Sequence, residues 1–179
     1  MHRARSCQTQ PVPERRLLLI RHTQAGEAPT DVDRPLTEKG ARAAAAIGSW
    51  LQQTGVLPDQ VILSPARRAV ETWDWALAAL PPGLQPVVDE RIYTNTVEAV
   101  LEAIRESPHE VRTLVVVGHN PSIGELATLL DDGAGDSAAR STLDSGFRTG
   151  GVAVFELDEP FAAIAPGEAR LTMFAVPGD

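Results

Sequence analysis

Cysteine, aromatic residues and long apolar runs are scarce in this sequence of 179 residues, and each scarcity excludes something. Cys7 is the only cysteine, so no internal disulfide can form, which fits a reducing compartment and predicts a cytoplasmic location. The apolar run at 17–20 is far too short for a secretory signal or a membrane span. Aromatic residues make up 4% of the chain, so aliphatic side chains must fill most of the core.

Positive charge is also in deficit, because the formal net charge is −8 at pH 7. Nucleic acids and anionic membrane surfaces are bound through clustered Lys and Arg, so neither is expected as a partner. Against this acidic background, arginines gathered in one place would mark a site for an anion. The sequence does not determine the oligomeric state.

The length fits one globular domain, and so does a composition of 43% hydrophobic and 22% charged residues. Residues 1–14 are predicted to form a disordered tail, and residues 15–179 a single domain. Strand and helix patterns alternate along that domain, which predicts an α/β fold. We expect a three-layer αβα sandwich with a mainly parallel central sheet.

Short aliphatic runs predict the strands, and apolar residues at helical spacing predict the helices. The expected strands are 17–20, 61–63, 87–88, 114–117, 151–157 and 169–176, with the last two as an antiparallel pair. The expected helices are 37–54, 64–80, 96–106 and 120–130. Thr37, Ser64 and Asn120 are the predicted N-caps, the last two followed by proline at the first helical position. The Gly-, Asp- and Ser-rich segment 131–149 reads as a surface loop.

Three of the predicted strands end in residues that can carry chemistry. The first ends in Arg21-His22, the second leads into a segment with Arg67 and Arg68, and the fourth leads into His119-Asn120. Ligands of an open α/β sheet bind beyond the carboxyl ends of its strands. If these strands are neighbours, they form a cationic pocket with two helix N-termini directed at it, and such a pocket suits a phosphoryl group.

A histidine beside a bound phosphoryl group can act as a nucleophile when its ring is neutral. Neighbouring arginines lower the pKa of an imidazole, so the same cations that hold the anion help to keep His22 unprotonated. His119 can donate a hydrogen bond to the transition state. Positive side chains do both jobs, so we expect no metal or other cofactor.

Each of these patterns is weak when taken alone. An Arg-His pair is common, His119 could be a hydrogen-bonded core residue, and arginines after Ser-Pro are usually solvated at a helix start. We interpret Arg67 as such a solvated residue. The joint occurrence of the three patterns, each at the carboxyl end of a strand, favours the site.

Four segments carry a more specific signal. Residues 18–25 (LLIRHTQA) resemble the opening motif of the histidine phosphatase superfamily, which has the phosphoglycerate mutase-like fold. Residues 33–40 (DRPLTEKG) are similar to a linker motif of its small SixA-like phosphohistidine phosphatase branch. Residues 64–72 (SPARRAVET) and 117–121 (VGHNP) resemble the second-arginine and second-histidine motifs. The resemblance spans about residues 16–176, with the motifs in the family's order.

The resemblance implies a role for several residues. It implies that His22 is the nucleophile, through a phosphohistidine intermediate, and that Arg21, Arg68 and His119 complete the phosphate pocket. It adds Arg34 and Asn120 as further phosphate or substrate contacts. Two positions depart from the family pattern: Thr23 stands where many members have glycine, and Glu71 where glutamine is frequent.

The general acid is harder to place. Relatives of the mutase type carry a glutamate in a loop after the second helix, and Glu90 lies at about that position. Glu90 is equally well interpreted as a solvent-facing carboxylate or as a partner of Arg91. An alkoxide leaves badly without a proton, whereas imidazole leaves more easily, so a weak acid would favour a phosphohistidine substrate.

These observations predict a metal-independent phosphatase that forms a covalent phosphohistidine and acts on phosphohistidine of a partner protein. Little sequence is available for a lid, and an open site suits a phosphorylated protein domain. A small phosphoester metabolite is the alternative substrate. A catalytically silent phosphate-binding module and a metal hydrolase using His22 and His119 are further alternatives.

Overall fold

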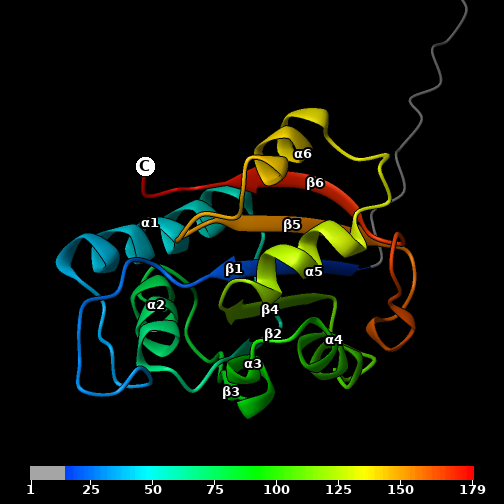
Figure 1. The fold of residues 1–179 in the computed structure, drawn as a ribbon. Coiled ribbons are helices and arrows are strands. Elements are labelled where there is room, and N and C mark those ends of the chain that lie inside the picture. Colours follow the sequence, from blue (N-terminus) through cyan, green and yellow to red (C-terminus); the bar gives the residue numbers. More distant parts are fainter. Residues whose placement is uncertain (1–14) are drawn as a thin grey trace, which may run out of the picture.

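The computed structural model describes residues 15–179, so the predicted tail at 1–14 lies outside the described residues. A six-stranded sheet in the order β3-β2-β4-β1-β5-β6 forms its centre. β1, β2, β3 and β4 run parallel to one another, whereas β5 is antiparallel to both β1 and β6. Figure 1 shows this sheet with helices on both sides, and the predicted α/β sandwich with a mainly parallel sheet is confirmed.

The strands and helices follow the predicted alternation. The strands are β1 Arg15–Arg21, β2 Gln60–Leu63, β3 Val87–Val88, β4 Thr113–Gly118, β5 Val152–Leu157 and β6 Arg170–Ala175. The helices are α1 Glu38–Thr54, α2 Arg67–Leu77, α3 Glu90–Thr94, α4 Val97–Arg105, α5 Ser122–Leu130 and α6 Ser137–Asp144, with a short 3-10 turn at Phe161–Ala163. The last two strands form the antiparallel pair that the sequence predicts.

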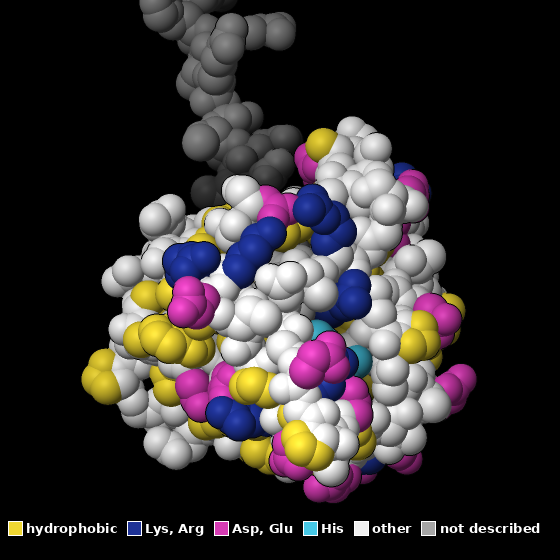
Figure 2. All heavy atoms as spheres, turned by 60° about the vertical axis from the view of Figure 1, so that its left-hand side comes forward, with side chains coloured by type: hydrophobic (Ala, Val, Ile, Leu, Met, Phe, Trp, Pro, Cys, Tyr) yellow, Lys and Arg dark blue, Asp and Glu magenta, His cyan; other side chains and the backbone are white. Residues whose placement is uncertain are grey.

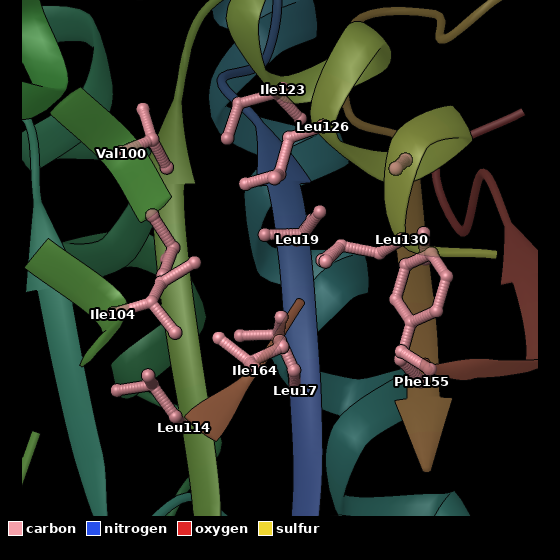
Figure 3. Close-up of a cluster of buried hydrophobic side chains, with 14 of the residues drawn as sticks. Leu17, Leu19, Val100, Ile104, Leu114, Ile123, Leu126, Leu130, Phe155 and Ile164 are labelled. Carbon is pink, nitrogen blue, oxygen red and sulfur yellow. The ribbon is translucent and has the colours of Figure 1, made fainter. Parts of the chain in front are cut away.

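The continuous apolar run of β1 is explained by burial on both faces. Leu17 and Leu19 belong to the core beneath α4 and α5, which Figure 3 shows in close-up. Leu18 and Ile20 belong to the core beneath α1 and α2. Because successive side chains of a strand point to opposite faces, a strand covered on both sides must be apolar at every position.

Two predicted helix starts are wrong. α2 begins at Arg67 after Ala66, and not after Ser64. The hydroxyl of Ser64 lies 2.7 Å from Nε2 of His119, so this side chain forms a hydrogen bond with the neighbouring strand's end and does not cap α2. α5 begins at Ser122 after Pro121, because the side chain of Asn120 turns away and donates to the carbonyl of Phe147. By contrast, Thr37 caps α1 through the amide of Gly40, as predicted.

Two helices were missing from the sequence prediction. Segment 131–149 contains α6, whose N-cap Asp136 accepts a hydrogen bond from the amide of Ala139. α3 is a single short helix that begins after Asp89, whose side chain accepts from the amide of Arg91. Both helices are short and capped by aspartate, and such segments have too few turns to show a helical period.

The contact between α1 and α2 is very close at one glycine. A Cβ atom built on Gly48 would lie 2.0 Å from the carbonyl oxygen of Ala76, so any side chain there would push the helices apart. This close approach sets α2 against α1, and α2 carries Arg68 at its start.

We expect Gly48→Ala to lower the free energy of unfolding by about 1–3 kcal/mol, because overpacking outweighs the better helix propensity of alanine. Denaturant unfolding followed by circular dichroism measures the change. Gly26→Ala is the matched control, since a Cβ there would meet its nearest neighbours at 3.8 Å, an ordinary contact. Equal stability of Gly48→Ala and the wild type would contradict the packing argument.

Candidate active site

The carboxyl ends of β1, β2 and β4 meet at one edge of the sheet. Backbone hydrogen bonds continue past the strands there, from the amide of His22 to Gly118 and from the amide of Ser64 to Val117. A cavity of about 590 Å³ opens at this edge. Its lining includes all of the predicted site residues except Glu90: Arg21, His22, Arg34, Arg68, His119 and Asn120. Figure 2 shows histidine side chains at the surface of this face, beside basic and acidic side chains.

The hydrogen bonds of His22 determine which ring nitrogen can react. Nδ1 lies 2.7 Å from the carbonyl oxygen of Thr23, and a carbonyl can only accept, so Nδ1 carries the proton. The lone pair therefore lies on Nε2, where Nε of Arg68 donates to it at 3.3 Å. The pKa of His22 is lowered to about 4, mainly by burial and also by the charges of Arg68, Arg21 and Arg34, while the hydrogen bond to the Thr23 carbonyl acts in the opposite direction. His22 is thus neutral at neutral pH.

His119 lies beside His22, with 5.1 Å between the ring centroids. Nε2 of His119 lies 2.7 Å from the hydroxyl of Ser64, which itself accepts from the amide of Ala66. When the hydroxyl of Ser64 donates to Nε2, the proton of His119 lies on Nδ1. That nitrogen is buried and has no partner among the described residues. The pKa of His119 is lowered to about 3, mainly by burial and also by its proximity to His22 and to the charge of Arg68.

The arginines of the cavity are held by backbone and carboxylate oxygens. Nη1 of Arg21 donates to the carbonyl of Phe147 at 2.9 Å, and its buried Nε has no partner within residues 15–179. Arg68, at the start of α2, is almost fully buried. Its Nη1 donates to the backbone oxygen of Asp31 at 2.7 Å, and its Nη2 to the Asp31 carboxylate at 3.0 Å. Neighbouring Arg67 is 57% exposed and pairs with Glu71, so its predicted solvated position is confirmed.

Arg34 and Asn120 flank the cavity. Nε of Arg34 donates to the carbonyl of Gly26 at 2.9 Å, and its Nη1 to Asp31 at 3.3 Å. Nδ2 of Asn120 donates to Phe147, whereas its Oδ1 is buried and has no partner in the part of the chain that the structure describes. Both side chains lie where a substrate could contact them.

Glu90 is not brought into the cavity. It is exposed at the first position of α3 and is not among the residues that line the site. Arg91, the alternative partner, pairs instead with Asp89 and Glu106. A role of Glu90 as general acid stays a prediction, without a contact that supports it.

Asp31 and Tyr93 are among the lining residues of the cavity that the sequence analysis missed, with Gln24, Ala25, Asn95 and Thr149. The carboxylate of Asp31 faces Arg68, Arg34 and the hydroxyl of Tyr93, the last at 3.0 Å. The ring of Tyr93 packs edge-on against His119, with 5.9 Å between centroids. Asp31 lies three residues before Arg34, and Tyr93 lies three residues after Glu90. Their closeness in sequence to predicted site residues is the signal that could have identified them.

The two departures from the family pattern lie outside the cavity lining. Thr23 is fully buried, and its amide and hydroxyl lie within 3.3 Å of the hydroxyl of Thr72 on α2. Glu71 accepts from the amide of Leu36 and from Arg67. Both residues tie the segment after β1 to α2, so they position the site without entering it.

Comparison with known proteins agrees with the fold and the site geometry. The sequence profile of the histidine phosphatase superfamily (branch 1) matches residues 17–95. An uncharacterised Mycobacterium tuberculosis protein is 34% identical over 161 residues, which cover 88% of this chain and 99% of that protein. A putative phosphohistidine phosphatase SixA from Nakamurella multipartitia has a structure that superposes with a TM-score of 0.80, with 33% identity, over 93% of this chain and 98% of that one. The phosphohistidine phosphatase SixA of Escherichia coli is 29% identical over 126 residues, 65% of this chain and 74% of that protein.

This chain belongs to the histidine phosphatase superfamily, and it is a phosphatase with the phosphoglycerate mutase-like fold. The predicted resemblance is therefore confirmed. Within residues 15–179, no helix is long and apolar enough to cross a membrane. The same residues contain no group of three or more His, Cys, Asp or Glu side chains that could hold a metal ion.

The lowered pKa values of both histidines predict a loss of stability in acid. An unfolded chain protonates both rings below about pH 6.5, but the folded chain does so only near 4 and 3. Between these pH values the unfolded state binds more protons than the folded state. The free energy of unfolding therefore decreases as the pH is lowered, by at most about 1.4 kcal/mol per pH unit for each histidine.

Unfolding by denaturant between pH 7 and pH 5, compared between the wild type and His119→Asn, isolates the part due to His119. We expect a shallower loss of stability in the variant. NMR titration of the rings checks the folded state directly, and an imidazolium signal from either ring at pH 6 would contradict the assignment.

Proposed function

We propose that the chain removes phosphoryl groups through a covalent intermediate on Nε2 of His22. The observation that carries this proposal is the lone pair of Nε2, which faces a cationic cavity while Nδ1 is held by the carbonyl of Thr23. A neutral imidazole with its lone pair on Nε2 can attack phosphorus without prior loss of a proton, once the N–H of Arg68 turns from Nε2 to an oxygen of the bound phosphoryl group. Water then attacks the phosphohistidine and releases phosphate.

The other cavity residues fit the charge of a phosphoryl group. Arg21 and Arg68 present planar guanidinium groups, which match phosphate oxygens in a bidentate manner. His119 offers its Nδ1 proton to an oxygen on which charge develops in the transition state. Arg34 and Asn120, at the edge of the cavity, are assigned to substrate contacts.

We further propose phosphohistidine on a partner protein as the substrate. The similarity to proteins described as phosphohistidine phosphatases supports this choice. The chemistry of the cavity supports it as well. Asp31 is the only carboxylate among the lining residues, and its contacts with Arg68 and Tyr93 favour the ionised form. A site without a protonated acid suits an imidazole leaving group better than an alkoxide.

A small phosphoester metabolite is the second candidate. The cavity volume of about 590 Å³ lies within the range of small-molecule sites. Phosphoserine as a substrate distinguishes the two candidates, because its alkoxide needs a proton that a phosphohistidine does not. Faster hydrolysis of phosphoserine than of phosphohistidine would favour the metabolite.

We expect His22→Ala to reduce hydrolysis of p-nitrophenyl phosphate by at least about 10³-fold, since the nucleophile is lost. Wild-type activity should persist in the presence of a chelator. Incubation with radiolabelled substrate should leave acid-labile, base-stable label on the wild type and none on His22→Ala. His109→Ala is the control, because His109 is an exposed histidine outside the cavity lining. Label on His22→Ala, or activity lost to chelator and restored by metal, would refute the proposal.

Glu90→Gln tests the general acid. Because Glu90 is exposed outside the cavity lining, we expect the variant to hydrolyse both phosphoserine and phosphohistidine within about twofold of the wild-type rate. Steady-state kinetics with the two substrates measure this. A selective loss of phosphoserine hydrolysis would instead assign the acid role to Glu90.

A further inference from the structure

Five side chains form a closed ring of contacts around the cavity. Arg68 joins His22 to Asp31, with 3.3 Å to the Nε2 of His22 and 3.0 Å to the Asp31 carboxylate. Tyr93 joins Asp31 to His119, and His119 returns to His22 with 5.1 Å between ring centroids. Along this ring, Asp31 and Tyr93 are joined to His22 through Arg68 and through His119.

The leaving group of an in-line displacement departs on the side opposite to the attacking atom. A phosphohistidine of a partner protein approaches from solvent, so when its phosphoryl group lies between His22, Arg68 and His119, its leaving group lies toward the opening of the cavity. The side chain of Asp31 is 55% exposed, whereas that of Arg68 is 8% exposed, so the carboxylate stands at the open end of the cavity. A leaving group on its way out meets this carboxylate.

The carboxylate of Asp31 can accept but not donate. Burial raises its pKa, but hydrogen bonds from Tyr93, Arg68 and Arg34 and the charge of Arg68 outweigh this and lower it overall. Arg68 and Tyr93 contact Oδ2, and Arg34 contacts Oδ1. Because each carboxylate oxygen accepts about two hydrogen bonds, Oδ1 retains capacity for one further donor.

An imidazole leaving group can supply this donor through its ring N–H. In a phosphohistidine, one ring nitrogen bonds phosphorus and the other can carry a proton. We propose that Asp31 determines specificity for phosphohistidine by accepting a hydrogen bond from the ring N–H of the substrate's imidazole. This inference rests on the proposed function of the site, since it assumes attack by His22.

The bonds and protons balance without an acid. Nε2 of His22 forms a bond to phosphorus while the P–N bond of the substrate breaks, and the electron pair returns to the substrate's nitrogen. The substrate binds as a phosphorylated imidazolium, with a proton on its second ring nitrogen, so its ring departs as neutral imidazole. His22 keeps its Nδ1 proton and becomes the phosphorylated imidazolium in turn. The N–H of the substrate's ring faces Asp31 just as Nδ1–H of His22 faces the carbonyl of Thr23. The phosphoryl group passes from one imidazole to another, each with its ring N–H bound to an oxygen acceptor, and no proton has to move.

The same carboxylate works against a phosphoester of an alcohol. An alkoxide leaving group needs a proton, which an ionised Asp31 held by two arginines cannot supply. Its negative charge would also approach the negative carboxylate. A charge-assisted hydrogen bond to imidazole therefore distinguishes the two kinds of substrate at one residue.

Asp31→Asn tests the inference, because asparagine keeps the size and one acceptor oxygen but loses the charge. The backbone oxygen of residue 31 still holds Nη1 of Arg68. The substrates are free phosphohistidine and p-nitrophenyl phosphate, whose leaving group needs neither a proton nor an acceptor. We expect kcat/KM for phosphohistidine to fall by about tenfold or more relative to that for p-nitrophenyl phosphate. Glu27→Gln is the control, an exposed carboxylate of the same segment outside the cavity lining.

Other outcomes would overturn the inference. An equal fall with both substrates would mean that Asp31 only positions Arg68. An unchanged or increased rate with phosphohistidine would mean that the carboxylate does not assist the leaving group. His22→Ala, measured alongside, separates this result from the proposed function: if His22→Ala is inactive while Asp31→Asn shows no selectivity, the nucleophile stands and only the role of Asp31 fails.

Discussion

The adjacency of β2, β4 and β1 is the constraint on which the site depends. These strands lie side by side and parallel, so Leu63 and Ile20 both align with Val117. The next residues of each strand then leave the sheet at one edge, and backbone hydrogen bonds from His22 and Ser64 keep them in register there. Segments that are far apart in sequence meet because aliphatic side chains bury both faces of the sheet.

The second constraint is the free energy required to remove arginine and histidine side chains from water at a partly buried site. Hydrogen-bond acceptors from the backbone and from one carboxylate offset it. The carbonyl of Phe147 accepts a hydrogen bond from Arg21, and the carbonyl of Thr23 accepts one from His22. The carboxylate of Asp31 accepts one from Arg68. The histidines stay neutral, so the positive charge of the cavity comes from arginine alone. An acidic chain thereby presents a local site for an anion.

Prediction from sequence separated a buried arginine from an exposed one at two adjacent positions. Arg68 and Arg67 are adjacent, yet Arg68 is buried beside His22 and Arg67 is exposed beside Glu71, because successive helix residues point in different directions. The choice of Arg68 came from the family motif. The N-cap predictions at Ser64 and Asn120 failed, because both side chains make contacts outside the helices that they were predicted to cap.

The sequence alone determined the α/β class, the aliphatic strands and the chemical type of the residues at their ends. These properties follow from periodicity and residue type, which are local. The tertiary structure decided which ring nitrogen of His22 is available, that Asp31 and Tyr93 line the cavity and that Glu90 does not. Each of these depends on contacts between segments distant in the chain, and such contacts arise only when the sheet brings those segments together.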